Sequence, residues 1–154
     1  MIIPDDPEHR MRLALEKARL GGENDEVPVG AVIIDSDGRL LAAAHDERHA
    51  TTDPTAHAEI LAIRRAAALI ADWRLENCSL YVTLEPCPMC AGALILARIS
   101  NLYYGAPSPK SGSVESLTRL LDVPGYNHRV QTQSGILAEE CSQVLSEYFQ
   151  KKRR

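Results

Sequence analysis

The chain has 154 residues, of which 45% are hydrophobic and 25% charged, and its formal net charge is −4. This length and composition predict one globular domain over residues 1–154, and the acidic balance excludes a generally basic nucleic-acid-binding protein. No apolar run approaches the roughly 20 residues that a membrane span needs, and the N-terminus lacks the basic and apolar segments of a signal peptide. We therefore expect a cytoplasmic protein without a membrane partner.

The first half of the chain alternates between helical and strand patterns. Apolar side chains follow a helical spacing after Asp6, which is a suitable N-cap, and Gly21 is expected to end that helix. Two β-rich apolar runs flank the segment SDG, which is typical of a hairpin turn. The expected elements are a helix at 7–20, strands at 27–35 and 39–45, a loop at 46–54 and a helix at 55–70.

The second half continues the alternation and contains a helix that starts with Pro88. This helix lies between two strand patterns, an order that predicts a parallel crossover. Helices that alternate with strands favour an α/β fold in which helices cover a sheet. The expected elements are strands at 80–84 and 99–106, a loop at 107–112, and helices at 88–98, about 114–121 and 136–150.

Two of the four cysteines lie three residues apart in the segment LEPCPMCAG (84–92). This spacing places the sulfur atoms of Cys87 and Cys90 on one side of a first helical turn. The N–H groups and the positive dipole at a helix start favour thiolate, which is the form that binds zinc. The motif alone also fits a redox pair or two packed thiols, and we interpret the other cysteines, Cys78 and Cys141, as packed thiols.

A second motif, DPTAHAEI (53–60), complements the cysteine pair. His57 would be a third zinc ligand at another helix start, and three protein ligands leave the fourth position open, as in catalytic zinc sites. Glu59 is suited to move a proton between water and a substrate. The combination of H-x-E with P-C-x-x-C is the pattern of zinc-dependent nucleobase deaminases. A non-catalytic zinc module or inactive partner subunit is the competing interpretation, although such a site has no need of Glu59.

Together with further segments, these motifs resemble the cytidine deaminase-like superfamily and, within it, the bacterial tRNA-specific adenosine deaminases. The resemblance implies zinc-dependent hydrolytic deamination of adenosine to inosine at the wobble position of tRNA. It also implies a three-layer α/β/α sandwich with a mixed five-stranded sheet, and a homodimer. It runs nearly end to end, through EVPVGAVI (26–33), WRLENCSLYVTLEPCPMCAGA (73–93), NHRV (127–130) and GILAEEC (135–141).

The resemblance assigns roles to individual residues. One Zn²⁺ per chain would be held by His57, Cys87 and Cys90, and Glu59 would be the catalytic proton shuttle. The implied substrate contacts are the backbone N–H of Ala58, the pocket-lining Leu84 and Glu85, and, for the tRNA anticodon loop, Tyr148, Phe149 and the basic tail at 151–154.

Two positions depart from the family pattern. Asp46 stands where these enzymes usually have an Asn that hydrogen-bonds the target base, and an ionised Asp only accepts hydrogen bonds. Either Asp46 is protonated beside the base, or the substrate presents a donor, or the loop aligns differently. Ser108 stands where many relatives have Asp, in a loop expected to touch nucleic acid. The alternative function is therefore deamination of a free nucleobase or nucleoside such as guanine.

Overall fold

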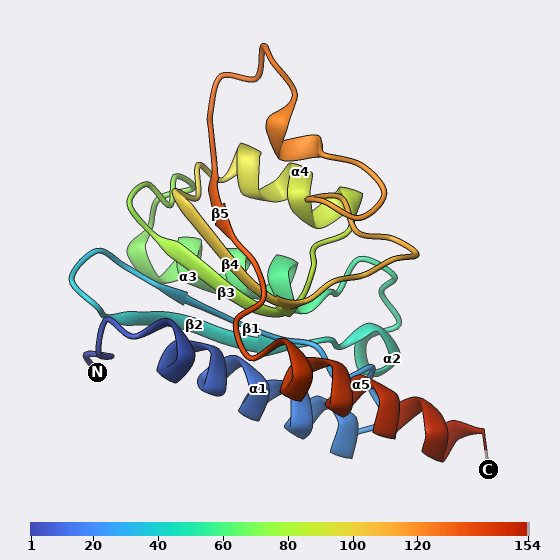
Figure 1. The fold of residues 1–154 in the computed structure, drawn as a ribbon. Helices are drawn as coiled ribbons and strands as arrows, with labels where there is room; N and C mark the ends of the chain where they lie inside the picture. The colour runs from blue at the N-terminus through green and yellow to red at the C-terminus, as the bar shows by residue number, and fades with distance from the viewer. Residues whose placement is uncertain (154) are drawn as a thin grey trace.

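The computed structural model describes residues 1–153, in which a mixed five-stranded sheet lies between two layers of helices (Figure 1). The expected three-layer α/β/α sandwich is confirmed. Arg154, the last residue of the basic tail that we expected to contact RNA, lies outside the described residues. Within residues 1–153, none of the helices combines the length and the apolar character that crossing a membrane requires.

The strands are β1 (Gly30–Ile34), β2 (Leu40–His45), β3 (Ser79–Leu84), β4 (Asn101–Ala106) and β5 (Gln131–Gln133). Their order in the sheet is β2-β1-β3-β4-β5. β1 pairs antiparallel with both of its neighbours, whereas β3, β4 and β5 run parallel. Helix α4 (Pro88–Leu96) joins β3 to β4, so the predicted parallel crossover is confirmed.

The remaining long helices divide between the two faces of the sheet. Helices α1 (Pro7–Glu23) and α5 (Ala138–Lys152) lie side by side on one face, while α3 (Ala58–Ile70) and α4 lie on the other (Figure 1). Each face has its own cluster of buried apolar side chains. Both motif helices, α3 and α4, therefore belong to the same layer.

Alternation along β1 supplies both apolar clusters, because successive strand side chains point to opposite faces. Val32 packs in the cluster beneath α1, and Ile33 packs in the cluster beneath α3. Gly30 lets α1 approach the sheet closely, because a Cβ at this position would overlap the Ala14 carbonyl oxygen. The strand is consequently buried along its whole length.

Two helix boundaries differ from the prediction for local reasons. Helix α1 continues past Gly21, whose missing side chain makes room for His45 of β2. Helix α3 begins at Ala58 rather than at position 55, because Asp53 accepts hydrogen bonds from the backbone N–H and the hydroxyl of Thr55 and holds a turn there. Gly21 therefore serves packing inside a helix, and Asp53 and Thr55 form a turn before one. Neither feature marks the helix terminus that the sequence pattern indicated.

The expected helix at about 114–121 is wrong. The segment forms turns followed by a short 3-10 helix, Leu120–Asp122. The carboxylate of Glu85 accepts hydrogen bonds from three successive backbone N–H groups, those of residues 114 to 116, and these donors are drawn towards the sheet. A long-range partner therefore overrides the local helical pattern.

Two short elements escaped the sequence pattern. Helix α2 (Arg48–Thr51) lies inside the expected loop at 46–54. Strand β5 has the sequence QTQ and is exposed at every position, so it lacks the apolar alternation that identifies a strand. It is recruited by parallel pairing with the edge of β4.

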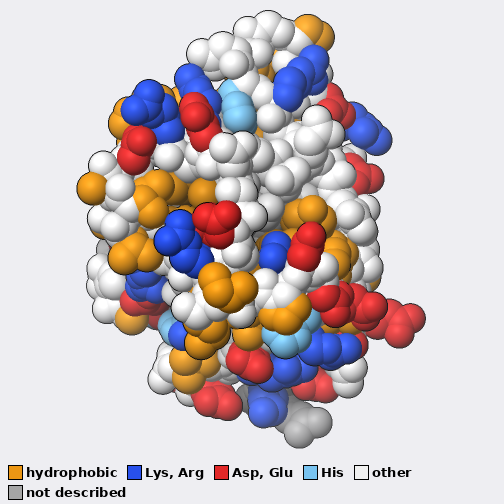
Figure 2. All heavy atoms as spheres, turned by 90° about the vertical axis from the view of Figure 1, so that its left-hand side faces the viewer, with side chains coloured by type: hydrophobic (Ala, Val, Ile, Leu, Met, Phe, Trp, Pro, Cys, Tyr) orange, Lys and Arg blue, Asp and Glu red, His pale blue; other side chains and the backbone are white. Residues whose placement is uncertain are grey.

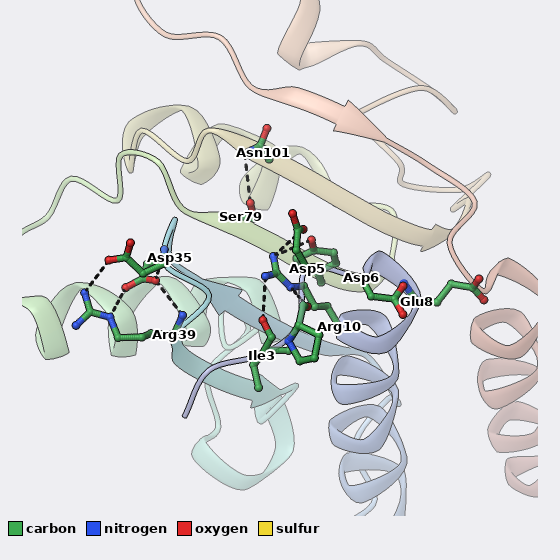
Figure 3. Close-up of polar contacts among 12 residues, drawn as sticks. Ile3, Asp5, Asp6, Glu8, Arg10, Asp35, Arg39, Ser79 and Asn101 are labelled. Atoms are coloured by element: carbon green, nitrogen blue, oxygen red, sulfur yellow. Dashed lines mark hydrogen bonds and ion pairs between the residues drawn. The ribbon is translucent and has the colours of Figure 1, made fainter.

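A buried arginine fastens the N-terminal segment to the sheet (Figure 3). Arg10 is 7% exposed and donates to the carbonyl oxygen of Ile3 and to the hydroxyl of Tyr81. In the nearby β1–β2 turn, Arg39 donates to Asp35 at 2.9 Å. Ile3, Arg10 and Asp35 border a groove of about 590 Å³ at the N-terminal ends of β3 and β4. Because the charged side chains around this groove pair with one another, we interpret these contacts as stabilising the fold.

The face on the left of Figure 1 mixes acidic, basic and apolar side chains (Figure 2). The described side chains on this face form no continuous basic surface, in agreement with the formal net charge of −4. This face therefore offers little general attraction to a polyanion.

Candidate metal centre and active site

The two sequence motifs meet at the starts of two helices. His57 is the N-cap residue of α3 and Cys87 is the N-cap residue of α4, and both have an extended backbone. Pro88 occupies the first position of α4, where its missing N–H would have no helical partner in any case. Neither N-cap side chain hydrogen-bonds to its own helix. Both are consequently free to face each other and Cys90.

The three ligand atoms are spaced as a tetrahedral metal site requires. His57 Nδ1 lies 3.7 Å from Cys87 Sγ and 3.6 Å from Cys90 Sγ, and the three atoms all lie within 4.8 Å of one another. Zinc at about 2.3 Å from sulfur and about 2.1 Å from nitrogen would separate these atoms by about 3.6 Å at tetrahedral angles. The donor set therefore fits a metal ion with one position left for a further ligand.

The two thiols differ in their affinity for a proton. A hydrogen bond from the Cys90 thiol is the main cause that lowers the pKa of Cys87 to about 4, and His57 adds to it. The same hydrogen bond, together with burial, raises the pKa of Cys90. Contact with Cys87 in turn raises the pKa of His57. One thiolate is thus present at neutral pH, and metal binding to such a set releases the remaining proton.

Glu59 lies in the first turn of α3 and is 4% exposed. Burial is the main cause that raises its pKa to about 7, and the negative charge of Asp46 acts in the same direction. A carboxyl group with this pKa gains and loses a proton near neutral pH, as a general acid and base must. The position and the pKa of Glu59 therefore both suit a proton shuttle.

Asp46 caps the helix that carries the histidine. Its Oδ1 accepts a hydrogen bond of 2.8 Å from the backbone N–H of Ala58, and its Oδ2 lies 3.2 Å from Nη2 of Arg48. Because His57 does not cap α3, Asp46 fills that role and places its carboxylate at the positive end of the helix dipole. Burial raises the pKa of Asp46, whereas Ala58 and Arg48 favour its ionised form. Two groups expected to contact the base therefore contact each other.

Glu85 organises the loop next to the metal centre. It is 2% exposed, and its carboxylate accepts hydrogen bonds from the backbone N–H groups of Ser108, Val114, Glu115 and Ser116 and from the Ser116 hydroxyl. Burial alone would raise its pKa, but these hydrogen bonds outweigh burial and lower the pKa to about 2. The carboxylate of Glu85 is therefore occupied by the loop, and its place in the substrate pocket stays a prediction.

Leu84, the other residue expected to line the pocket, directly precedes Glu85, and Ser108 belongs to the loop expected to touch nucleic acid. Leu84 is half-buried at the end of β3 and packs against both apolar clusters. Ser108 is buried, and its hydroxyl oxygen lies 3.0 Å from that of Ser111. The residue that replaces the usual Asp is therefore engaged within its own loop.

Sequence reasoning missed two residues that shape the segment at 46–51. Glu26 is 1% exposed, and its carboxylate accepts hydrogen bonds from the backbone N–H groups of His49 and Ala50 at the start of α2. A glutamate directly before an apolar strand was the available signal. Arg48, the ion-pair partner of Asp46, had no such signal, because the fold of the loop decides which carboxylate it meets.

Comparison with known sequences gives consistent matches over nearly the whole chain. The family model of MafB19-like deaminases matches residues 5–153. The tRNA-specific adenosine deaminase of Agrobacterium fabrum is 47% identical over 145 residues, which span 94% of this chain and 95% of that protein. The tRNA-specific adenosine deaminase of Bacillus subtilis is 43% identical over 144 residues, which span 94% of this chain and 89% of that protein.

Comparison with solved structures agrees. A structure from a study of A-to-I editing by tRNA:A34 deaminases has a TM-score of 0.86 and 47% sequence identity, and the match covers 89% of this chain and 99% of that chain. A guanine deaminase from Nitrosomonas europaea has a TM-score of 0.81 and 27% identity, with 96% of this chain and 86% of that chain covered. The chain therefore belongs to the MafB19-like deaminase family, together with the bacterial tRNA-specific adenosine deaminases.

Proposed function

We propose that this protein is a zinc-dependent hydrolase that converts adenosine to inosine at the wobble position of tRNA. The observation that carries the proposal is the meeting of His57, Cys87 and Cys90 beside the buried Glu59. It occurs in a chain 47% identical to a tRNA-specific adenosine deaminase over 94% of its length. The site supports hydrolytic deamination, and the relatives support tRNA as the substrate.

The residues of the site divide the reaction between them. His57, Cys87 and Cys90 would hold one zinc ion, which when bound lowers the pKa of a coordinated water towards ~7 and so supplies a nucleophile at neutral pH. Glu59 would take up a proton on a carboxylate oxygen as water adds to C6 of adenine, and would deliver that proton to N1. A second proton, from the hydroxyl group that C6 has gained, would pass through Glu59 to the amino group, so that ammonia leaves and the C6 oxygen becomes the carbonyl of inosine.

We place the anticodon loop against the C-terminal part of α5. Tyr148, Phe149 and Lys152 line a groove of about 510 Å³ together with His49 of α2. The Phe149 side chain is 43% exposed and meets Tyr148 edge to face, with 5.4 Å between ring centroids. An exposed aromatic ring beside a lysine suits stacking of an unpaired base and contact with its phosphate.

We further propose a homodimer in the cytoplasm, where a tRNA substrate would be available. Large apolar side chains are exposed on the outer surface of the α3–α4 layer and the loop that follows it. Leu69 is 65% exposed, Leu96 71% and Leu117 60%. Exposed apolar groups of this size are typical of surfaces that bind another protein. A second copy of the chain is the occupant that the family resemblance supports.

A second candidate function is deamination of free guanine. The acceptor oxygens of Asp46 favour it, because the amino group and N1–H of guanine are donors. The similarity to the guanine deaminase from Nitrosomonas europaea is the other supporting observation, at 27% identity.

One assay separates these functions. The zinc-loaded protein is incubated with an anticodon stem-loop RNA and, side by side, with a panel of free nucleobases and nucleosides. We expect inosine in the RNA and no release of ammonia from guanine. Ammonia from guanine without inosine in the RNA would transfer the assignment to the second function. A protein that binds zinc but forms neither product would be a non-catalytic zinc module.

A further inference from the structure

An ion pair at the start of α3 has no part in the proton transfers. The Asp46 side chain is 5% exposed and divides its oxygens between the Ala58 N–H, at 2.8 Å, and Arg48, at 3.2 Å. The Arg48 side chain is 39% exposed, so it links the buried carboxylate to the outside of the site. A guanidinium carries several N–H donors in a rigid planar fork. Arg48 therefore keeps donors for a ligand while it stays paired with Asp46.

The other carboxylates around this loop have different partners. Glu47 pairs with Arg65 at 2.6 Å, and Glu26 accepts the backbone N–H groups at the start of α2. Arg48 is thus directed towards Asp46 and is not drawn away by its neighbours. Its position is set from two sides, by the short helix that it begins and by the carboxylate that it meets.

Adenine presents two ring-nitrogen acceptors near the reacting carbon, N1 and N7. Glu59 delivers its proton to N1, so N7 requires a separate donor. An ionised Asp46 cannot donate, and the Ala58 N–H already binds Asp46. We propose that Arg48, held in place by Asp46, donates a hydrogen bond to N7 of the target adenosine and is the specificity-determining residue of the site. This inference rests on the proposed tRNA adenosine deaminase function.

The Asp46→Asn substitution introduces a new hydrogen-bond donor and keeps the helix cap. In Asp46→Asn the amide oxygen still accepts from the Ala58 N–H, while the new NH₂ group can itself donate to N7. Arg48→Met removes the guanidinium and keeps an unbranched side chain. The requirement for Arg48 should therefore disappear once Asn stands at position 46. This dependence is specific to a shared role in recognition, since a contact of Arg48 with phosphate would not depend on residue 46.

The test measures kcat and KM for inosine formation with four proteins: wild type, Arg48→Met, Asp46→Asn and the double variant. Each acts on a stem-loop RNA with adenosine or 7-deazaadenosine at the target position. For wild type we expect kcat/KM to fall roughly tenfold to a hundredfold when N7 is removed, as for a lost hydrogen bond to a charged group. Arg48→Met should lose a similar factor with adenosine and little more with 7-deazaadenosine. In the Asp46→Asn background, Arg48→Met should change little.

Arg39→Met is the matched control, because Arg39 is also an exposed arginine paired with a largely buried aspartate (Figure 3). Asp35 borders the groove at the starts of β3 and β4, whereas Cys87 follows the opposite end of β3. It should leave all rates unchanged, and zinc content and thermal midpoint verify that each variant is folded. The role of Arg48 would be overturned if Arg48→Met had the same effect in the wild-type and Asp46→Asn backgrounds, or the same effect with adenosine and 7-deazaadenosine. Inosine formation by wild type would leave the proposed function in place. Absence of inosine with wild type would overturn the proposed function and this inference with it.

Discussion

His57 and Cys87 occupy helix N-cap positions, yet neither side chain hydrogen-bonds to its own helix. Asp46 accepts the hydrogen bond from Ala58 that an N-cap side chain would normally take, and this leaves the His57 ring for the metal centre. Glu59 lies in the first turn of the same helix, and its burial raises its pKa to about 7. At the residue scale, the proposed functions of ligation, capping and proton transfer therefore fall on separate side chains, and each side chain can be removed by itself.

Glu59→Gln should abolish turnover and leave the metal in place. Glutamine has nearly the same shape but cannot accept and release the proton, and general acid–base catalysis typically contributes about 10²- to 10⁴-fold. Inosine formation and zinc content are measured on the same preparation. Turnover close to that of wild type would show that another group carries the proton.

Cys87→Ala should lose most of the bound zinc. The pKa of about 4 marks Cys87 as the ligand that is a thiolate before metal arrives, and the two remaining ligands rarely hold zinc. Zinc per chain is measured after dialysis, with Cys78→Ala as the control because Cys78 is buried in the apolar cluster beneath α3 and α4. Full zinc occupancy in Cys87→Ala would contradict the ligand assignment.

Three buried carboxylates act on whole elements by collecting backbone N–H groups. Asp46 binds the start of α3, Glu26 binds the start of α2, and Glu85 binds the loop at 108–116. A backbone donor buried without a partner is costly, so each carboxylate stabilises the segment whose N–H groups it binds. At the element scale, the loops around the metal centre are therefore fixed by charge-assisted hydrogen bonds.

The stabilisation provided by Glu85 should depend on pH. Its pKa is about 2 in the folded protein, against a usual value near 4.5, so the contribution is present above pH ~4.5 and is lost as the pH falls towards ~2. The shift corresponds to about 3 kcal/mol at neutral pH. The difference in unfolding free energy between wild type and Glu85→Gln, measured by urea denaturation, should shrink as the solution is acidified.

Glu76→Gln serves as the control for this pH series, because Glu76 is exposed just before β3. Its effect on the unfolding free energy should be small at every pH. A Glu85→Gln effect that stayed constant from neutral to acidic pH would contradict the origin assigned to the low pKa.

These same carboxylates mark the limit of prediction from the sequence. Apolar periodicity located α1, α3, α4 and four strands, and the two motifs pointed to His57, Cys87 and Cys90, which the structure brings together. The turns at 114–118 and helix α2 escaped prediction because Glu85 and Glu26, distant in sequence, supply their partners. Strand β5 escaped because an exposed edge strand needs no apolar side chains. Apolar periodicity thus predicts helices and strands that bury one face, whereas these segments depend on hydrogen bonds to residues distant in sequence.

On the scale of the whole molecule, the sandwich brings the two motifs together because α3 and α4 cover the same face of the sheet (Figure 1). Their N-termini carry His57 and Cys87, so the ligands converge at one end of this layer. The outer surface of the layer exposes Leu69 and Leu96, where we place the second subunit.

Leu96→Asp should convert the proposed dimer to a monomer. A charge placed at an apolar interface costs several kcal/mol unless it is paired, and Leu96 is 71% exposed in the single chain, so the fold itself should tolerate the change. Leu20→Asp is the control, because Leu20 is 41% exposed on α1 across the sheet. Light scattering gives the mass of each variant. A Leu96→Asp protein that kept the mass of wild-type dimers, or a monomeric wild type, would contradict this placement.

The most direct test of the account is the nucleoside composition of unmodified tRNA after incubation with the wild-type protein, with Glu59→Gln and with wild type stripped of zinc by a chelator. The account predicts inosine at the wobble position with the zinc-loaded wild type, none with the other two proteins, and recovery when zinc is returned to the stripped protein. A wild-type protein that binds one zinc per chain and leaves the wobble adenosine unchanged would contradict it.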